Sequence, residues 1–172
     1  DAKKDYVDHY GAKSDLKRSN EAAWQNAQPL VKTHLAELAQ HYHASAQKSK
    51  KTEDYQEAVR WYRAYLEAFP NDPDAAQTNF LLAELLYEDG QFDASRYPQA
   101  AAEYEKTAYR YPRHAKSADA GYAALLAYAQ QEKRASGAEQ KRIQLASVDS
   151  AVQFARTFGD DPRVAPVLTN AA

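Results

Sequence analysis

Two histidines with a glutamate between them are the strongest hint of metal chemistry in the sequence. His34 and His41 are seven residues apart, with Glu37 between them. On a helix this spacing puts both imidazoles on one face. A helical zinc-hydrolase motif instead needs histidines four apart with a glutamate directly after the first, and any zinc site needs three or four converging ligands. We therefore predict that these histidines are structural or solvated, with no bound metal or other cofactor.

Acidic residues gather at two proline-containing junctions and raise the alternative of calcium binding. The four are Asp72, Asp74, Asp160 and Asp161. The ligand spacing of a helix-loop-helix calcium site is absent around them. Aspartate before a helix accepts hydrogen bonds from free backbone amides, and proline fits the first helical position. We therefore predict that these residues cap helices.

The sequence offers no arrangement for nucleophilic or nucleotide chemistry. Cysteine is absent from the 172 residues, which excludes thiol catalysis and disulfides. Glycine-rich phosphate loops, dinucleotide fingerprints and a serine nucleophile elbow are also missing, and the serines are scattered on polar faces. We predict that the chain is not an enzyme.

Charge and hydropathy limit the partners. The 22 basic and 24 acidic residues are interspersed and give a net charge of -2, so nucleic acid is not an expected partner. The longest apolar run is too short to span a bilayer, so direct membrane insertion is not expected either. Since the sequence begins with Asp1 rather than methionine, we expect it to be part of a longer chain.

The elements that carry these residues are expected to be helical. The sequence is rich in alanine and holds only 5 glycines and 7 prolines, most of them where a helix would begin or end. Its aromatic residues are mainly tyrosines, 13 against 5 phenylalanines. This composition predicts an all-α fold with close helix contacts and amphipathic aromatic residues between them.

A helical pattern recurs along the chain and ends each time at an aromatic residue. It runs from Tyr55 to Pro70, again from Tyr97 to Pro112, and more weakly from Val148 to Gly159. A second helical series alternates with it over 35–42, 80–87 and 121–128. A helix pair repeated at about 40 residues must stack on its neighbours to bury its apolar face, which predicts an α-solenoid of antiparallel helix pairs.

The expected boundaries follow from this punctuation. The three pairs occupy about 29–69, 73–111 and 115–158, with short flanking helices at about 3–10, 20–27 and 162–171. Gly11 ends the first short helix, Ser19 and Asn20 can cap the second, and Pro29 opens or kinks the long helix after it. The charged stretch Lys48–Lys51 connects the first pair. One small residue in each of the paired helices is expected to be buried where helices cross: Ala39, Ala58, Ala83, Ala100, Ala124 and Ala151.

The middle pair resembles the tetratricopeptide (TPR) repeat. The run Leu82-Ala83-x-x-Leu86-Tyr87-x-x-Gly90-x-Phe92 resembles the first half of that motif, and Ala100, Tyr104, Thr107 and Pro112 resemble the second half. The resemblance implies one right-handed TPR-like superhelix across 1–172, with repeats at about 29–70, 71–112 and 113–159 and partial repeats at both ends. An insertion at Asp93–Tyr97 departs from the family's usual unit and leaves the superhelix pitch open.

The tyrosine-rich second helices are most similar to TPR lipoproteins and accessory proteins of the bacterial cell envelope. This implies a periplasmic or outer-membrane-associated location, with the cytoplasm as the alternative.

In TPR proteins the first helix of each pair lines a concave groove. The resemblance carries this role to Gln40, His43, Gln77, Phe80, Glu84, Tyr87, Glu88, Leu125 and Tyr128. Phe80 and Tyr87 would offer apolar contact and the two glutamates charge, which suits a basic or aromatic-rich protein or peptide segment. Three tyrosines recur at one repeat position, and we favour packing between helices over a ligand platform for them: Tyr42, Tyr87 and Tyr128.

The resemblance favours a non-catalytic scaffold for protein–protein interaction. Two alternatives stay open: a structural spacer within a longer solenoid, and a helical domain acting on glycans or peptidoglycan. The last would need a cleft with paired acidic residues at catalytic separation.

Overall fold

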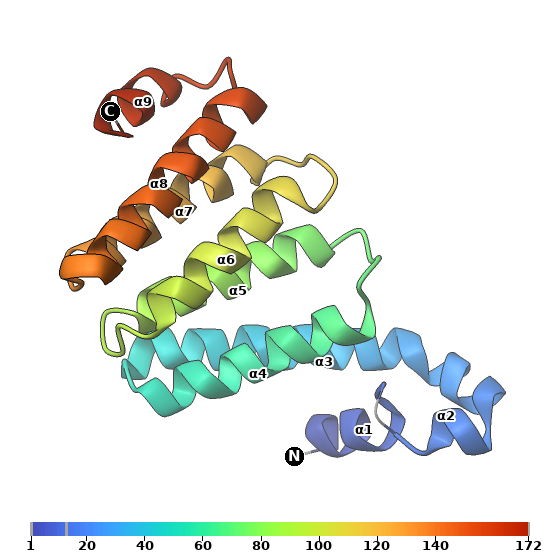
Figure 1. The fold of residues 1–172 in the computed structure, drawn as a ribbon. Coiled ribbons are helices and arrows are strands. Elements are labelled where there is room, and N and C mark those ends of the chain that lie inside the picture. The colour runs from blue at the N-terminus through green and yellow to red at the C-terminus, as the bar shows by residue number, and fades with distance from the viewer. Residues whose placement is uncertain (1, 13, 172) are drawn as a thin grey trace. The chain divides into compact units, whose positions relative to one another are not determined.

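The computed structural model describes residues 2–12 and 14–171, and the regular structure within them is entirely helical (Figure 1). The all-α prediction is confirmed. In chain order the helices are α1 (Ala2–Tyr10), α2 (Leu16–Ser19), α3 (Glu21–Ser49), α4 (Thr52–Ala68), α5 (Ala75–Asp89), α6 (Arg96–Tyr109), α7 (Ser117–Glu132), α8 (Gly137–Thr157) and α9 (Val164–Ala171). Contacts divide the chain into two compact units, residues 1–78 and 79–172, with the boundary inside α5.

In unit 1, α3 and α4 form an antiparallel pair (Figure 1). Two residues connect them, and Lys50 takes a left-handed conformation there with φ of 56° while its amide donates to the Ala46 carbonyl. The core between the two helices holds aliphatic residues of α3 and aromatic residues of α4. The larger of these buried side chains include Val31, Leu35, Leu38, Tyr55, Trp61 and Tyr65.

The short helices α1 and α2 pack against α3. Lys4 of α1 also reaches α4, where its ammonium lies 2.7 Å from Glu57 Oε1. The predicted end of the first helix at Gly11 is confirmed, since the Gly11 amide donates to the Val7 carbonyl directly after α1. The single turn of α2 was not expected from the sequence.

Of the two possibilities expected at Pro29, a helix that opens there is wrong, because α3 begins at Glu21 and continues through Pro29. The residues before Pro29 do not form a separate helix over 20–27. Asn20 does cap this helix, accepting a hydrogen bond from the Ala23 amide (3.1 Å), but the helix is the long one. Proline leaves the carbonyl four residues earlier, that of Gln25, without its helical donor. Gln25 and Pro29 are both exposed, so water can satisfy that carbonyl and the helix continues.

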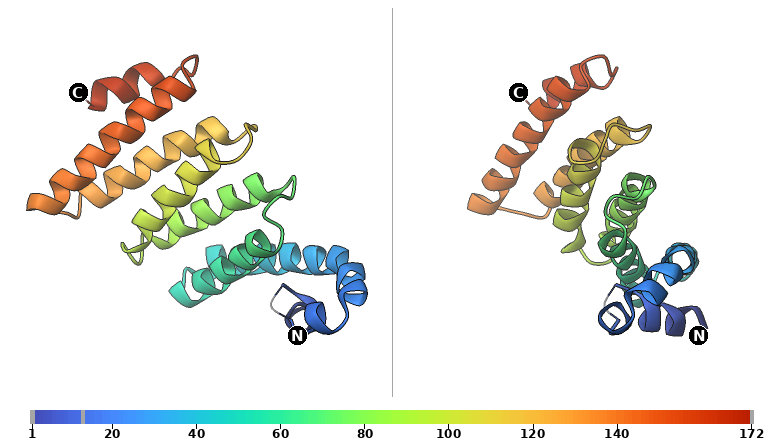
Figure 2. Two further views of the ribbon diagram at one scale, coloured as in Figure 1. Left: turned by 45° about the vertical axis from the view of Figure 1, so that its right-hand side comes forward. Right: turned by 90° about the vertical axis from the view of Figure 1, so that its right-hand side faces the viewer.

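In unit 2, α6 packs against α7, α7 against α8, and α8 against α9. Both views of Figure 2 show α7 and α8 side by side. The connections predicted at the aromatic stops are confirmed, since α6 ends at Tyr109 and α8 at Thr157. The insertion between the halves of the middle pair is shorter than expected, because Arg96 and Tyr97 already belong to α6.

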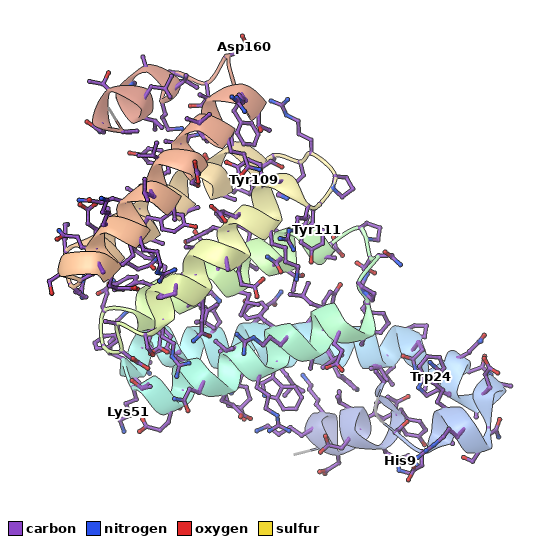
Figure 3. The ribbon with its side chains drawn as sticks, viewed as in Figure 1. His9, Trp24, Lys51, Tyr109, Tyr111 and Asp160 are labelled. Atoms are coloured by element: carbon purple, nitrogen blue, oxygen red, sulfur yellow. The ribbon has the colours of Figure 1, made fainter. Side chains whose placement is uncertain are left out.

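Two of the four aspartates bind a backbone amide just ahead of a helix, at the residue before its first, rather than an amide within it. Asp72 accepts a hydrogen bond from the Asp74 amide, and Asp161 accepts one from the Arg163 amide, each at 2.9 Å. Asp160 instead lies exposed in the α8–α9 connection (Figure 3). The burial predicted for the six alanines is also confirmed, since none is more than 2% exposed. Across residues 2–12 and 14–171, every helix is too short or too polar to cross a membrane.

Candidate functional site

The face of α5 that carries most of the predicted groove residues is held against α6 by a buried amide. Asn79 is fully buried, and its Nδ2 donates to the Glu103 carbonyl and to Thr107 Oγ1, each at 2.9 Å. The Thr107 hydroxyl in turn donates to the same carbonyl. These buried hydrogen bonds fix the rotation of one helix against the next, although Asn79 Oδ1 is buried without a partner among the described residues.

At its other end, α5 is fixed by an ion pair and a close backbone approach. Arg96 Nε lies 3.1 Å from Asp89 Oδ2 and 3.2 Å from Asp93 Oδ2, and the Asp89 side chain is 1% exposed. A Cβ at Gly90 would stand 2.6 Å from the Tyr97 ring, so only glycine lets the two helices come this close. The side chains on α5 therefore sit on a rigid support.

Phe80 and Tyr87 pack against tyrosines of α6. The Phe80 ring centroid is 5.9 Å from that of Tyr104, and Tyr87 lies 5.4 Å from Tyr97 and 6.4 Å from Tyr104. Phe80 is buried and Tyr87 half-buried, so both contribute mainly to packing. The preference for a packing role at Tyr87 agrees with this placement.

Glu84 is half-buried between these two aromatic residues on α5. Among the described residues its carboxylate forms neither a hydrogen bond nor an ion pair, and Lys116 acts on it only at longer range. Burial raises the pKa of Glu84 above its ordinary value, and the nearby charges of Glu88 and Asp119 raise it further. Burial likewise raises the pKa of Tyr104, with Glu84 and Glu88 adding to it. A partly desolvated carboxylate thus stands on this face without a bound cation.

Two charged residues at the start of α7 complete this face, and sequence reasoning missed both. The Lys116 ammonium lies 5.6 Å from the Phe80 ring centroid and 3.4 Å from Asp119 Oδ2. Asp119 is also bound by Arg163, at 3.0 Å. The three-residue spacing of Lys116 and Asp119 indicates a shared helix face, but nothing in the sequence places that face beside Glu84. We call the surface formed by Phe80, Glu84, Glu88, Lys116 and Asp119 the Glu84 face.

Leu125 and Tyr128 are not part of the Glu84 face. Tyr128 follows Asp119 by nine residues, which is about two and a half helical turns and puts it on the other side of α7. Its hydroxyl donates to Glu105 Oε1 of α6 (3.2 Å), and burial together with Glu105 raises the pKa of Tyr128 to about 12. Leu125 lies on the same helix, three residues before Tyr128, and is half-buried. Tyr128 therefore packs between helices, as favoured for the recurring tyrosines.

The remaining predicted groove residues belong to unit 1. Gln40 and Gln77 are exposed, while His43 is half-buried with its Nδ1 2.8 Å from the Tyr62 hydroxyl. Tyr42 lies under the Lys4 ammonium, 4.5 Å from its ring centroid.

The histidines considered for metal binding are far from forming a site. His34 Nδ1 lies 3.4 Å from Glu37 Oε2, and its ring packs on Tyr6 at 5.2 Å. His41 is exposed and packs beside Tyr42. In the described part of the chain, no three acidic or histidine side chains converge in a way that could hold a metal ion.

No protein-family model matches the chain, and no curated protein is significantly similar to it in sequence.

Proposed function

We propose that the chain is a non-catalytic scaffold that binds a basic segment of a partner protein at the Glu84 face. The successive helix pairs with buried alanines support a TPR-like α-solenoid as its architecture. Together with the resemblance of the middle pair to the TPR motif, this supports a role in protein–protein interaction. On that resemblance we also propose a location in the bacterial envelope, in the periplasm or at the outer membrane.

The observation that carries the proposal is the state of Glu84. A half-buried carboxylate without a cation destabilises the folded chain, since it loses hydration without gaining a partner. Lys116 could swing to it only by leaving Asp119 and the Phe80 ring, where its ammonium now lies. A lysine or arginine supplied by a partner would pair with Glu84 and be attracted by Glu88 and Asp119 as well. Binding of such a cation would explain why a half-buried carboxylate is present at Glu84 although it does not stabilise the fold.

The neighbouring residues favour arginine or a lysine flanked by aromatic residues in the partner. Tyr87 and Glu88 are half-buried and present an apolar ring edge beside a second carboxylate. Arginine combines a flat guanidinium, which stacks on aromatic rings, with donors for two carboxylates. The proposed segment is therefore basic with interspersed aromatic residues.

A binding assay with matched variants tests this proposal. Fluorescently labelled peptides of equal length, one basic and aromatic, one acidic and one neutral, would be titrated with the parent chain and with Glu84→Gln. We expect the basic peptide to bind best, to weaken as salt is added, and to lose about tenfold in affinity on Glu84→Gln, equivalent to about 1.4 kcal/mol. Glu139→Gln is the control, because Glu139 is exposed on α8 and paired with Arg142.

Two outcomes would count against the proposal. If Glu84→Gln and Glu139→Gln bound the basic peptide as well as the parent does, the Glu84 face would not be the site. If none of the peptides bound at all, the result would favour the alternative that the chain is a structural spacer, because a spacer needs no exposed recognition surface.

A further inference from the structure

The short helix α1 places a lysine in a site formed by α3 and α4 (Figure 1). The Lys4 ammonium lies 2.7 Å from Glu57 Oε1, 4.5 Å from the centre of the Tyr42 ring and 5.5 Å from that of Trp61. A carboxylate beside aromatic rings attracts an ammonium group both by charge and through the electron-rich ring faces. We call Tyr42, Glu57 and Trp61 the lysine site. It belongs to unit 1 and shares no residue with the Glu84 face.

The three residues of the lysine site come from elements other than α1. Tyr42 is on α3, while Glu57 and Trp61 are on α4. The Trp61 indole N–H donates to Glu57 Oε1 at 3.0 Å and so orients the carboxylate. The other carboxylate oxygen, Oε2, lies 3.6 Å from Arg60 Nη1, and the Arg60 guanidinium packs 4.7 Å from the centre of the Trp61 ring. Arg60 is thus already engaged, and Oε1 takes a cation from outside α3 and α4.

Polar contacts hold α1 to its neighbours more than apolar burial does. Of the nine residues of α1, all of them described, Val7 alone is buried. Lys3 forms a second ion pair, 2.9 Å from Glu37 Oε2, in which both side chains are 46% exposed. Salt weakens ion pairs as exposed as this one, and so short a helix has little stability of its own. We therefore expect α1 to leave α3 and α4 at a low cost in free energy.

Another cation can enter the lysine site after α1 has moved away. Trp61 is 2% exposed while α1 is in place, which leaves no room for a second cation beside Lys4. The Lys4 and Glu57 side chains are 27% and 25% exposed, so their ion pair lies at the surface of the chain. The position of Lys4 shows which chemical group fits there.

We propose that α1 is a detachable helix that fills the lysine site within its own chain, and that a lysine-bearing segment of a partner protein displaces it and binds there. A primary ammonium suits the site because it donates an N–H to Glu57 Oε1 while it lies near an aromatic ring. A trimethylated lysine keeps the charge but lacks this donor.

The partner is a different protein rather than a second copy of this chain. The α1 helix of a second copy would make the same contacts as the chain's own α1. The chain's own helix is tethered, so its effective concentration gives it the advantage. A different protein can add contacts of its own and overcome that advantage.

Hydrogen exchange tests whether α1 detaches. In the parent chain the hydrogen-bonded amides of α1 should exchange at least about tenfold faster than those of α4, and faster still as salt is added. A double variant, Lys3→Gln with Lys4→Gln, should remove the remaining protection of α1 and leave that of α4. Lys141→Gln, at an exposed position of α8, is the control and should leave both unchanged.

A peptide with the α1 sequence, residues 2–10, is the lysine-bearing probe for binding to the full chain. Two indole N–H signals report on it in ¹⁵N-labelled protein. That of Trp61 is bonded to Glu57 and reports on the lysine site, while that of Trp24 donates to the Gly11 carbonyl (3.3 Å) and reports on the departure of α1. The double variant should bind the peptide about tenfold more tightly than the parent does, because its own α1 competes less.

Substitutions in peptide and chain then locate the site. A peptide with glutamine in place of Lys4, or with trimethyllysine there, should bind the double variant at least about threefold more weakly. In the double variant, a further Glu57→Gln should weaken the peptide at least about tenfold, and Tyr42→Leu about threefold. A further Glu139→Gln, on α8, should leave binding unchanged.

Three results would overturn the proposal. One is protection of α1 as strong as that of α4 at every salt concentration. Another is a peptide that fails to bind the double variant, or that binds parent and double variant equally. The third is a dimer that forms with rising concentration of the parent and is lost in the double variant, which would make a second copy of this chain the occupant.

Discussion

The two units treat their partly buried carboxylates in opposite ways. In unit 1, burial works against the charged form of Glu57, but hydrogen bonds from Lys4 and Trp61 outweigh it and lower the pKa. Asp72 behaves in the same way, with Lys32 at 2.6 Å. In unit 2, the carboxylate of Glu84 lacks such a bond among the described residues, and its pKa is raised by burial.

The difference distinguishes carboxylates that stabilise the fold by pairing with a cation from a carboxylate that has no such stabilising role. Glu57 joins α1 to α4, and Asp72 joins the chain after α4 to α3. Removing either acid takes from a lysine its closest carboxylate, 2.7 Å from Lys4 and 2.6 Å from Lys32. Removing the charge of Glu84 leaves no such loss, so its presence calls for another explanation, and binding is the one that we propose.

The largest expected effect tests the packing that keeps Glu84 half-buried. Ala100 on α6 is fully buried, and Ala100→Leu should overpack the contact and destabilise the chain by about 1–3 kcal/mol. Ala102→Leu is the matched control, because Ala102 lies exposed on the same helix. Thermal melts measure both. Equal melting temperatures for the two variants would mean that Ala100 does not lie at a tight helix contact.

The next effect contrasts the two glutamates directly. Glu57→Gln removes the charge that binds Lys4 and should destabilise the chain by about 0.5–1.5 kcal/mol. Glu84→Gln removes an unpaired charge and should raise the free energy of unfolding. Urea titration at neutral pH and low salt measures both changes. A loss of stability in both variants would show that Glu84 also has a stabilising partner, and the contrast would disappear.

A smaller effect is the pH dependence of unit 2, where Asp161 and Glu84 should act with opposite sign. The hydrogen bond from Arg163 lowers the pKa of Asp161 to about 2, so its stabilisation is present above the ordinary value of 3.8 and is lost as the pH falls through about 2. The pKa of Glu84 is raised, so its unfavourable charge weakens stability at neutral pH and is relieved as the pH falls.

Variants separate these two pH dependences. The stability difference between Asp161→Asn and the parent should shrink between about pH 4 and pH 2. The difference for Glu84→Gln should instead begin to shrink at a pH above the ordinary value of 4.5 and vanish once the pH falls below that value. Denaturant titrations over a pH series give both curves. Two differences that closed over the same pH range would contradict the opposite shifts.

The sequence determines the helix pairs more clearly than the functional surface. Aromatic residues followed by proline or glycine marked the ends near Phe69, Tyr111 and Phe158, because these are local signals. A helix start at Pro29, one of the two possibilities expected there, was wrong because the exposure of the freed carbonyl depends on how α3 packs. The cluster of Glu84 with Lys116 also could not be predicted, since it arises where segments distant in sequence meet.

The smallest effect compares two left-handed backbone positions, one in each unit. Lys50, between α3 and α4, has φ of 56°, and Gly137, at the start of α8, has φ of 59°. This conformation crowds the Cβ of every residue except glycine, at a cost of about 1–2 kcal/mol. Glycine at such a position avoids this cost, but part of the stabilisation is lost because glycine also makes the unfolded chain more flexible.

Lys50→Gly should therefore stabilise the chain by only about 0.5 kcal/mol, and Gly137→Ala should destabilise it by about 1 kcal/mol. A Cβ at Gly137 would meet no atom within 4 Å, so the second change reports backbone strain without a steric clash. Lys50→Ala removes the same charge as Lys50→Gly but keeps a Cβ, and should not stabilise. Thermal melts distinguish the cases. If Lys50→Ala stabilised as much as Lys50→Gly, the gain would come from relieving repulsion with Lys48 and Lys51 rather than from the backbone.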